Sequence, residues 1–171
     1  MTDTPDIREN RLYDLLRRLG IAWHSIAHAP VFTVEESADI YGRLTGGHTK
    51  NLFLKDKKGG LWLVVVLAHT KVDLPALAKQ LGAPRFSFGT AALLEATLGI
   101  TPGSVTPFAL MNDTAHVVTP VLDATMLQID PINFHPLRND RTTAIAPGDL
   151  VAFVKACGHH PVIAPIPEKT G

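Results

Sequence analysis

Residues 46–67 read GGHTKNLFLKDKKGGLWLVVVL, and this stretch decides the fold. Two apolar runs flank a polar turn with two lysines and two glycines, which is the pattern of a β-hairpin with strands at 49–55 and 61–67. The second run is rich in valine and does not alternate with polar residues, so we expect both of its faces to be covered. A sheet packed on both sides is therefore the expected centre of the molecule.

Helices are predicted before and after this hairpin from apolar residues at helical spacing and from capping residues. A T-x-x-E box at Thr33 is expected to begin a helix that ends near Gly42. Another helix should have Pro147 in its first turn and Gly158 at its end. The predicted helices lie at about 6–19, 33–42, 73–81, 90–98 and 147–157.

The second half of the chain is richer in predicted strands. Asn112 and Asp113 are expected to form a tight turn between the first two of them. The mixed order of helices and hairpins favours an α/β fold with a mixed, partly barrel-like β-sheet and surrounding helices. No linker or repeat interrupts the sequence, so residues 1–171 are expected to form a single domain. The strand candidates are 21–28, 105–110, 115–122, 126–129, 132–135, 142–145 and an extended end at 162–166.

Composition narrows the function classes. The 171 residues carry 16 basic and 16 acidic side chains, and this zero net charge argues against a strongly basic nucleic-acid coat protein. A single cysteine excludes a disulfide framework and a multi-cysteine zinc site. The longest apolar run, 61–68, is too short to cross a membrane, and the polar N-terminus does not resemble a signal peptide. We therefore expect a cytoplasmic protein with no membrane contact.

The familiar catalytic motifs are absent. The sequence contains no P-loop, no G-x-S-x-G elbow and no H-E-x-x-H, and its eight histidines show no metal-ligand spacing. We expect no metal and no cofactor. Cys157 lies on the apolar face of a predicted helix and is interpreted as a buried hydrophobic residue rather than a nucleophile. His24 and His116 are expected to be structural, and His159 with His160 should lie on a solvated turn.

Three segments carry the candidate site residues. Lys50 and Asn51 open an apolar strand behind two glycines, where a cation is suited to a phosphate, although a plain surface lysine is the alternative. Residues 99–107 read GITPGSVTP, and Gly103 allows a ligand to approach the main chain closely, although a simple turn explains it too. His135 ends a predicted strand, where it either faces a cleft or is structural.

Taken together, these segments resemble the YbaK/ProX family of aminoacyl-tRNA deacylases, which also forms the inserted editing domain of bacterial prolyl-tRNA synthetases. The motifs are TKNLFLKD at 49–56, GSVTP at 103–107 and NFHP at 133–136. The likeness extends over roughly 8–166 and is greatest to the free-standing subgroup that clears alanine mischarged on proline tRNA. It implies a mixed-sheet α/β fold and hydrolysis of the ester between an amino acid and the tRNA 3′ adenosine.

The resemblance also assigns roles to residues. It places the functional lysine of the family on Lys50, the loop glycine on Gly103 and the histidine on His135. These three are the expected catalytic residues. An aminoacyl ester is already activated, so such an enzyme needs placement, oxyanion stabilisation and water rather than a covalent nucleophile. The residues expected to bind substrate are Asn51, Ser104 and Pro107.

Partners and alternatives follow from the same resemblance. The expected partner is aminoacyl-tRNA, contacted at its 3′ end and acceptor stem, with prolyl-tRNA synthetase as a second candidate; nothing in the sequence supports DNA binding. Alanyl-tRNA for proline is the expected substrate. The alternatives are a deacylase for cysteine on proline tRNA, a non-catalytic nucleic-acid-binding module and a metal-dependent hydrolase.

Overall fold

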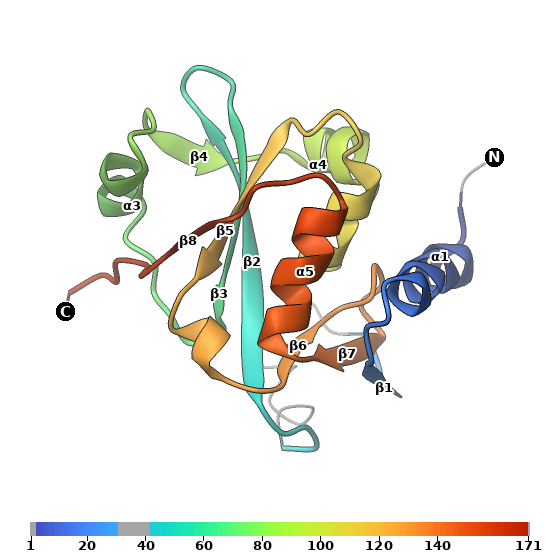
Figure 1. Ribbon diagram of the computed structural model, residues 1–171. Coiled ribbons are helices and arrows are strands. Elements are labelled where there is room, and N and C mark those ends of the chain that lie inside the picture. The colour runs from blue at the N-terminus through green and yellow to red at the C-terminus, as the bar shows by residue number, and fades with distance from the viewer. Residues whose placement is uncertain (1–2, 31–41, 171) are drawn as a thin grey trace.

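The structure is a computed structural model that describes residues 3–30 and 42–170. Its strands are β1 (His24–Ala27), β2 (Gly47–Asp56), β3 (Leu61–Leu67), β4 (Phe86–Phe88), β5 (Val118–Asp123), β6 (Ile132–Phe134), β7 (Arg141–Ile145) and β8 (Val162–Ala164). In this part of the chain they form one mixed sheet in the order β1-β7-β6-β2-β3-β5-β8, and β4 adds to β2 outside that path (Figure 1). The predicted mixed-sheet α/β class is confirmed.

The predicted hairpin is confirmed as β2 and β3, which pair antiparallel from Thr49 opposite Leu67 to Lys55 opposite Leu61. Asp56 closes the turn, because its carboxylate accepts hydrogen bonds from the N–H groups of Lys58 and Gly60, each at 2.9 Å. The same carboxylate accepts the Trp62 indole N–H at 3.0 Å. The hairpin turn is therefore held by one buried acidic side chain.

Helices α1 (Pro5–Arg18), α3 (Leu74–Leu81), α4 (Ala91–Leu98) and α5 (Pro147–Ala156) surround the sheet (Figure 1). The side chains of Thr4, Asp73 and Thr90 cap the first three by accepting main-chain N–H groups. Gly82 and Gly99 end α3 and α4 in the left-handed conformation, as predicted. The helix predicted at 33–42 lies outside the described residues except for Gly42. No described helix is long and apolar enough to span a membrane.

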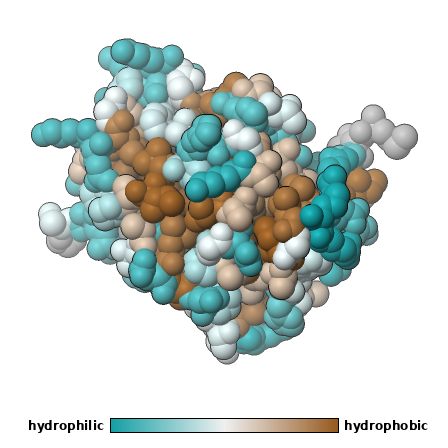
Figure 2. All heavy atoms as spheres, viewed as in Figure 1, coloured by the Kyte–Doolittle hydropathy of each residue, from teal (hydrophilic) through white to brown (hydrophobic). Residues whose placement is uncertain are grey.

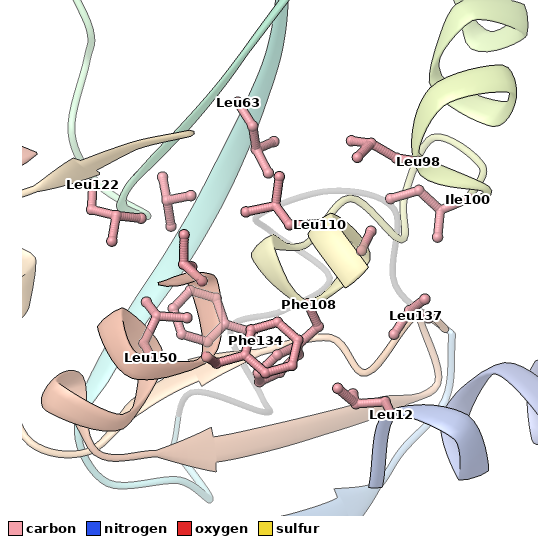
Figure 3. Close-up of a cluster of buried hydrophobic side chains, with 14 of the residues drawn as sticks. Leu12, Leu63, Leu98, Ile100, Phe108, Leu110, Leu122, Phe134, Leu137 and Leu150 are labelled. Atoms are coloured by element: carbon pink, nitrogen blue, oxygen red, sulfur yellow. The ribbon is translucent and has the colours of Figure 1, made fainter. Parts of the chain in front are cut away.

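β3 separates two hydrophobic cores, because its successive side chains point to opposite faces. Leu63 and Val65 join the larger core, which is packed by α1, α4 and α5 and is shown in part in Figure 3. Val64 and Val66 join a smaller core with α3. Both faces of β3 are therefore covered, as its missing alternation predicted. Hydrophilic residues gather instead at the tip of the β2–β3 hairpin and along α1 (Figure 2).

Two predicted strands are wrong. Residues 105–110 and 126–129 lie largely in the 3₁₀ helices η1 (Pro107–Asn112) and η2 (Met126–Gln128). In η1 the proline fixes φ and lacks an N–H, and the Thr106 hydroxyl accepts the Phe108 N–H at 3.3 Å, which starts a helical turn. A short apolar run that is buried on all sides has no period that separates strand from helix.

The predicted turn at Asn112 and Asp113 does not join two strands, because η1 precedes it. Asp113 instead accepts the N–H groups of Val117 and Val118 at 3.1 and 2.8 Å. The remaining predicted strands are confirmed with shifted ends as β1, β5, β6, β7 and β8. β4 was not predicted, because three residues after a proline are too few to show alternation.

Candidate active site

The candidate site lies along one edge of β2. One edge of this strand pairs with β3, while the other pairs with β6 at Gly47 and His48 and with β4 at 54–56. Between them, residues 49–53 have no strand partner on that edge within the described chain. The loop at 101–106 reaches this gap, where the Asn51 side-chain N–H group donates to the Val105 carbonyl at 2.9 Å. The sheet is therefore split where the sequence places its candidate residues.

Lys50 and His135 both follow the short parallel pair of β2 and β6. This pairing sets His48 beside Asn133 and ends there. Lys50 and His135 each lie two residues beyond the last paired residue of their own segment. The pairing therefore brings two segments that are 85 positions apart in the sequence to the same end of the β2–β6 contact.

Lys50 is half-buried, and this burial lowers the pKa of its ammonium group. The main chain of Lys50 belongs to the continuous antiparallel pairing of β2 with β3, where it lies opposite Val66. A cation that has lost part of its hydration interacts more strongly with an anionic ligand than a fully solvated lysine does. Lys50 is therefore a suitable group for a phosphate or for the edge of a ribose.

His135 is held by its main-chain neighbours in one tautomer. Its Nδ1 lies 2.9 Å from the Arg141 carbonyl oxygen, which only accepts hydrogen bonds, so Nδ1 carries the proton. The neutral ring then has its lone pair on Nε2. Burial, with a smaller contribution from nearby His28, lowers the pKa of His135 and favours this neutral form.

His28 is a candidate site residue that the sequence did not indicate. Its ring centroid lies 6.1 Å from that of His135, its Nδ1 is 2.8 Å from the Ala29 carbonyl oxygen, and its Nε2 is 2.8 Å from the Thr142 hydroxyl. The carbonyl again fixes the proton on Nδ1, so in the neutral ring Nε2 accepts from Thr142. No motif marks His28, because its partners come from β7, more than 110 positions away.

A cavity of about 180 Å³ opens between β2 and the loop at 101–106, which contains Gly103. Asn51 and Gly103 both line it, together with small residues such as Gly89 and Ala91. Gly103 has φ of 92°, a conformation that favours glycine. The Asn51 Oδ1 is buried and has no hydrogen-bond partner among the described residues, so it is an acceptor without a donor.

Ser104 and Pro107 are buried rather than open to this cavity. The Ser104 N–H donates to the Thr101 carbonyl at 3.1 Å, which tightens the loop around Gly103. Pro107 is the first residue of η1. Both shape the loop, and their contact with substrate stays a prediction.

A buried charge cluster supports the His135 segment from α1. Glu9, only 5% exposed, accepts the Tyr13 hydroxyl at 2.9 Å and faces Arg141 Nε at 3.3 Å and Arg138 Nη1 at 3.4 Å. Arg138 also pairs with Asp140, and this contact lowers the pKa of that carboxyl. Since the Arg141 carbonyl orients His135, the cluster connects α1 to the ring of a candidate catalytic residue.

His159 corrects an expectation, because it is buried rather than solvated. Its Nε2 lies 2.9 Å from Asp113 Oδ2, and both side chains are buried. Burial raises the pKa of the Cys157 thiol to about 11, so this side chain is protonated at neutral pH. No group of three metal-binding side chains occurs among residues 3–30 and 42–170.

Comparisons with known proteins point to one family. Residues 28–153 match the family model described as an aminoacyl-tRNA editing domain. Prolyl-tRNA synthetase associated domain-containing protein 1 of Danio rerio is 41% identical over 92% of this chain and 86% of its own. The prolyl-tRNA editing protein ProX of Acetoanaerobium sticklandii is 35% identical over 84% of this chain and 88% of its own. A solved structure, described as a candidate trans-editing enzyme for prolyl tRNA synthetase, shares the fold with a TM-score of 0.74 at 20% identity, covering 98% of this chain and 99% of that chain.

Proposed function

Because the chain belongs to the aminoacyl-tRNA editing domain family, a family of aminoacyl-tRNA deacylases, we propose that it removes alanine from mischarged proline tRNA in trans. The observation that carries this proposal is the match over residues 28–153, a range that includes Lys50, Gly103 and His135. The sequence motif at 49–56 overlaps the unpaired edge of β2 at 49–53, so we assign both to one site.

The chemistry proposed for this site is hydrolysis of an ester. The oxygen of a water molecule forms a bond to the acyl carbon, the carbon–oxygen bond to the ribose breaks, and a proton passes to the ribose oxygen. Lys50 would hold the terminal phosphate or the ribose edge. His135 would accept a hydrogen bond at Nε2 and so orient the water or the substrate. Main-chain N–H groups around Gly103 would meet the carbonyl oxygen as it gains charge.

The choice of alanine is supported by the size and lining of the cavity beside Asn51. At about 180 Å³ it is smaller than the cavities of about 330 and 450 Å³ beside Gly47 and Asn133. Gly89 and Ala91 leave room on one side of it and larger apolar residues such as Leu94 close the rest, which suits a small apolar side chain. The unpaired Asn51 Oδ1 lies beside this space and would suit the substrate α-ammonium group, whose N–H groups donate.

The proposed partner is the 3′ end of the tRNA with a short part of the acceptor stem. Phosphate contacts dominate the affinity of most nucleic-acid-binding proteins, and a chain with zero net charge is suited to a small footprint. Sharing the tRNA with prolyl-tRNA synthetase in the cytoplasm would supply the remaining affinity.

The test is a panel of proline tRNAs charged with alanine, cysteine or proline, each incubated with the purified protein while loss of the ester is followed. We expect rapid loss of alanine and much slower loss of proline. An intact alanyl ester in the presence of folded protein would contradict the proposal. Faster release of cysteine than alanine would favour the cysteine alternative, and tRNA retention without ester loss would indicate a binding module.

A further inference from the structure

Phe88 is a large hydrophobic side chain that the fold leaves 64% exposed. It ends β4, directly opposite Leu54 of β2, and it lines the same cavity as Asn51 and Gly103. The other phenylalanine of this strand, Phe86, is buried in the smaller core. Its place at the rim of the proposed catalytic cavity, rather than its exposure alone, makes Phe88 available to a ligand bound there.

The β4 register places Phe88 on the same face as Lys50. Residues directly opposite each other in an antiparallel pair share a face, so Phe88 lies on the side of Leu54. Lys50 lies on that side too, four residues earlier on β2 and about 13 Å away along the strand. Leu52, midway between them, also lines the cavity. The side chains of Lys50 and Phe88 can therefore contact different parts of one ligand that lies along β2.

The main chain beside Phe88 is fixed rather than adaptable. The Gly89 N–H donates to the Phe53 carbonyl at 2.9 Å, which ties the end of β4 to β2. A Cβ atom on Gly89 would lie 2.4 Å from the Phe53 ring, so only glycine allows this close approach. The main chain that carries Phe88 is therefore held in place beside the cavity, which reduces the entropy lost when a ligand binds there.

The charges around Phe88 favour a nucleic-acid ligand over an apolar protein segment. Lys57 and Lys58 lie exposed in the hairpin turn that follows β2, whereas Lys55, which pairs with Ser87, points to the other face of the sheet from Phe88. A single aromatic ring among cations is the arrangement that proteins use for single-stranded RNA, in which bases stack and phosphates contact lysines. An apolar protein partner would instead need a continuous hydrophobic patch.

From this geometry we infer that Phe88 is a stacking subsite for the terminal base of the tRNA 3′ end. The inference rests on the proposed function and extends it, because it assigns a base-binding role to a residue outside the motifs of the sequence. The ester would lie near Lys50 and His135, and the chain of the terminal nucleotide would follow β2 toward β4. The lysines of the hairpin turn would contact the preceding phosphates.

A microhelix with the acceptor-stem sequence and 2-aminopurine as its terminal base tests the inference. The fluorescence of this base falls when it stacks on an aromatic ring. We expect binding to the wild-type protein to quench the fluorescence and Phe88→Ala to weaken binding by about tenfold with loss of quenching, as for removal of a stacking aromatic. Phe88→Trp should retain both. Ile163→Ala, which removes another exposed side chain on β8, is the matched control and should change neither.

Two results would overturn the inference. One is a Phe88→Ala protein that binds and quenches like the wild type. The other is full binding by Phe88→Leu, because this would show that apolar contact is sufficient without an aromatic face. Wild-type deacylation of alanyl-tRNA for proline, measured in parallel, separates the two proposals: its absence contradicts the function, whereas normal deacylation with an unaltered KM in Phe88→Ala contradicts the stacking subsite alone.

Discussion

Lys50 and Lys55 lie on the same strand, yet their surroundings differ completely. Lys50 is half-buried at the gap in β2, and burial lowers its pKa. Lys55 is exposed where β2 pairs with both β3 and β4. The first half of the strand thus carries the candidate site residues at an unpaired edge, and the second half is paired on both sides. Two lysines on one strand therefore differ in chemical role because only one of them lies where the strand has an unpaired edge.

The largest expected effect is on Lys50. Lys50→Ala should keep the protein folded but lower deacylation about 10²-fold, equivalent to about 2.7 kcal/mol of transition-state stabilisation. Lys55→Ala, Lys57→Ala and Lys58→Ala should change the chemical step much less, because these side chains lie toward the turn. Single-turnover rates at saturating enzyme separate chemistry from binding. A Lys50→Ala protein that reacts near the wild-type rate, together with a large loss of rate in the turn-lysine variants, would contradict this prediction.

A second test uses the pH dependence of the reaction. Burial and His28 lower the pKa of His135, while Asp140 and the Arg141 carbonyl oppose this shift. The ring should therefore be neutral at pH 7, and the rate should fall about tenfold per pH unit only below the ordinary histidine value of about 6.5. Single-turnover rates, corrected for spontaneous ester hydrolysis, measure this limb. An acid limb that persists unchanged in His135→Asn would exclude His135 as its origin.

A third test concerns the support of His135 by α1. Glu9→Gln removes the charge that faces Arg138 and Arg141 but keeps the shape, so we expect kcat to fall by about five- to tenfold with little change in KM. Imidazole nitrogen NMR should show His135 leaving its single Nδ1–H tautomer. Asp14→Asn, which makes the same chemical change on an exposed part of α1, is the control. A lower melting temperature with an unaltered His135 tautomer would show that Glu9 stabilises the fold and does not position His135.

In the hairpin half of β2, a carboxylate should affect stability rather than catalysis. Asp56→Asn should lower the free energy of unfolding by about 1–3 kcal/mol, because the Trp62 indole loses its acceptor. Hydrogen bonds lower the folded-state pKa of Asp56, so its contribution is present above the unfolded value of about 3.9 and is lost as the pH falls through the folded value. Denaturant unfolding at pH 7 and below pH 4 should show the difference shrinking. A lower kcat per folded molecule in Asp56→Asn would show that this half of β2 also affects catalysis.

The smallest expected effect concerns Cys157 and metal. Cys157→Ala and treatment with EDTA should each leave the deacylation rate within about twofold, because the thiol is protonated and partly buried against the core. Rate measurements with and without EDTA, followed by added zinc, provide the check. Activity that EDTA abolishes and zinc restores would favour the metal-dependent hydrolase.

The sequence by itself determined the hairpin, the helix caps at Asp73 and Thr90, and the identity of Lys50, Gly103 and His135 as candidates. These signals act over a few residues or reside in one motif, so they can be read without coordinates. The roles of those three residues stay predictions.

Only the tertiary structure decided which distant segments meet. It added β4 to the edge of β2, set His28 beside His135, and placed Glu9 against Arg141, whose carbonyl orients the His135 ring. These contacts join residues thirty or more positions apart, except between His135 and Arg141, and the local pattern does not encode them. A strand edge becomes a site only when other strands pair with part of it and leave the rest open, and that outcome belongs to the packing of the whole sheet.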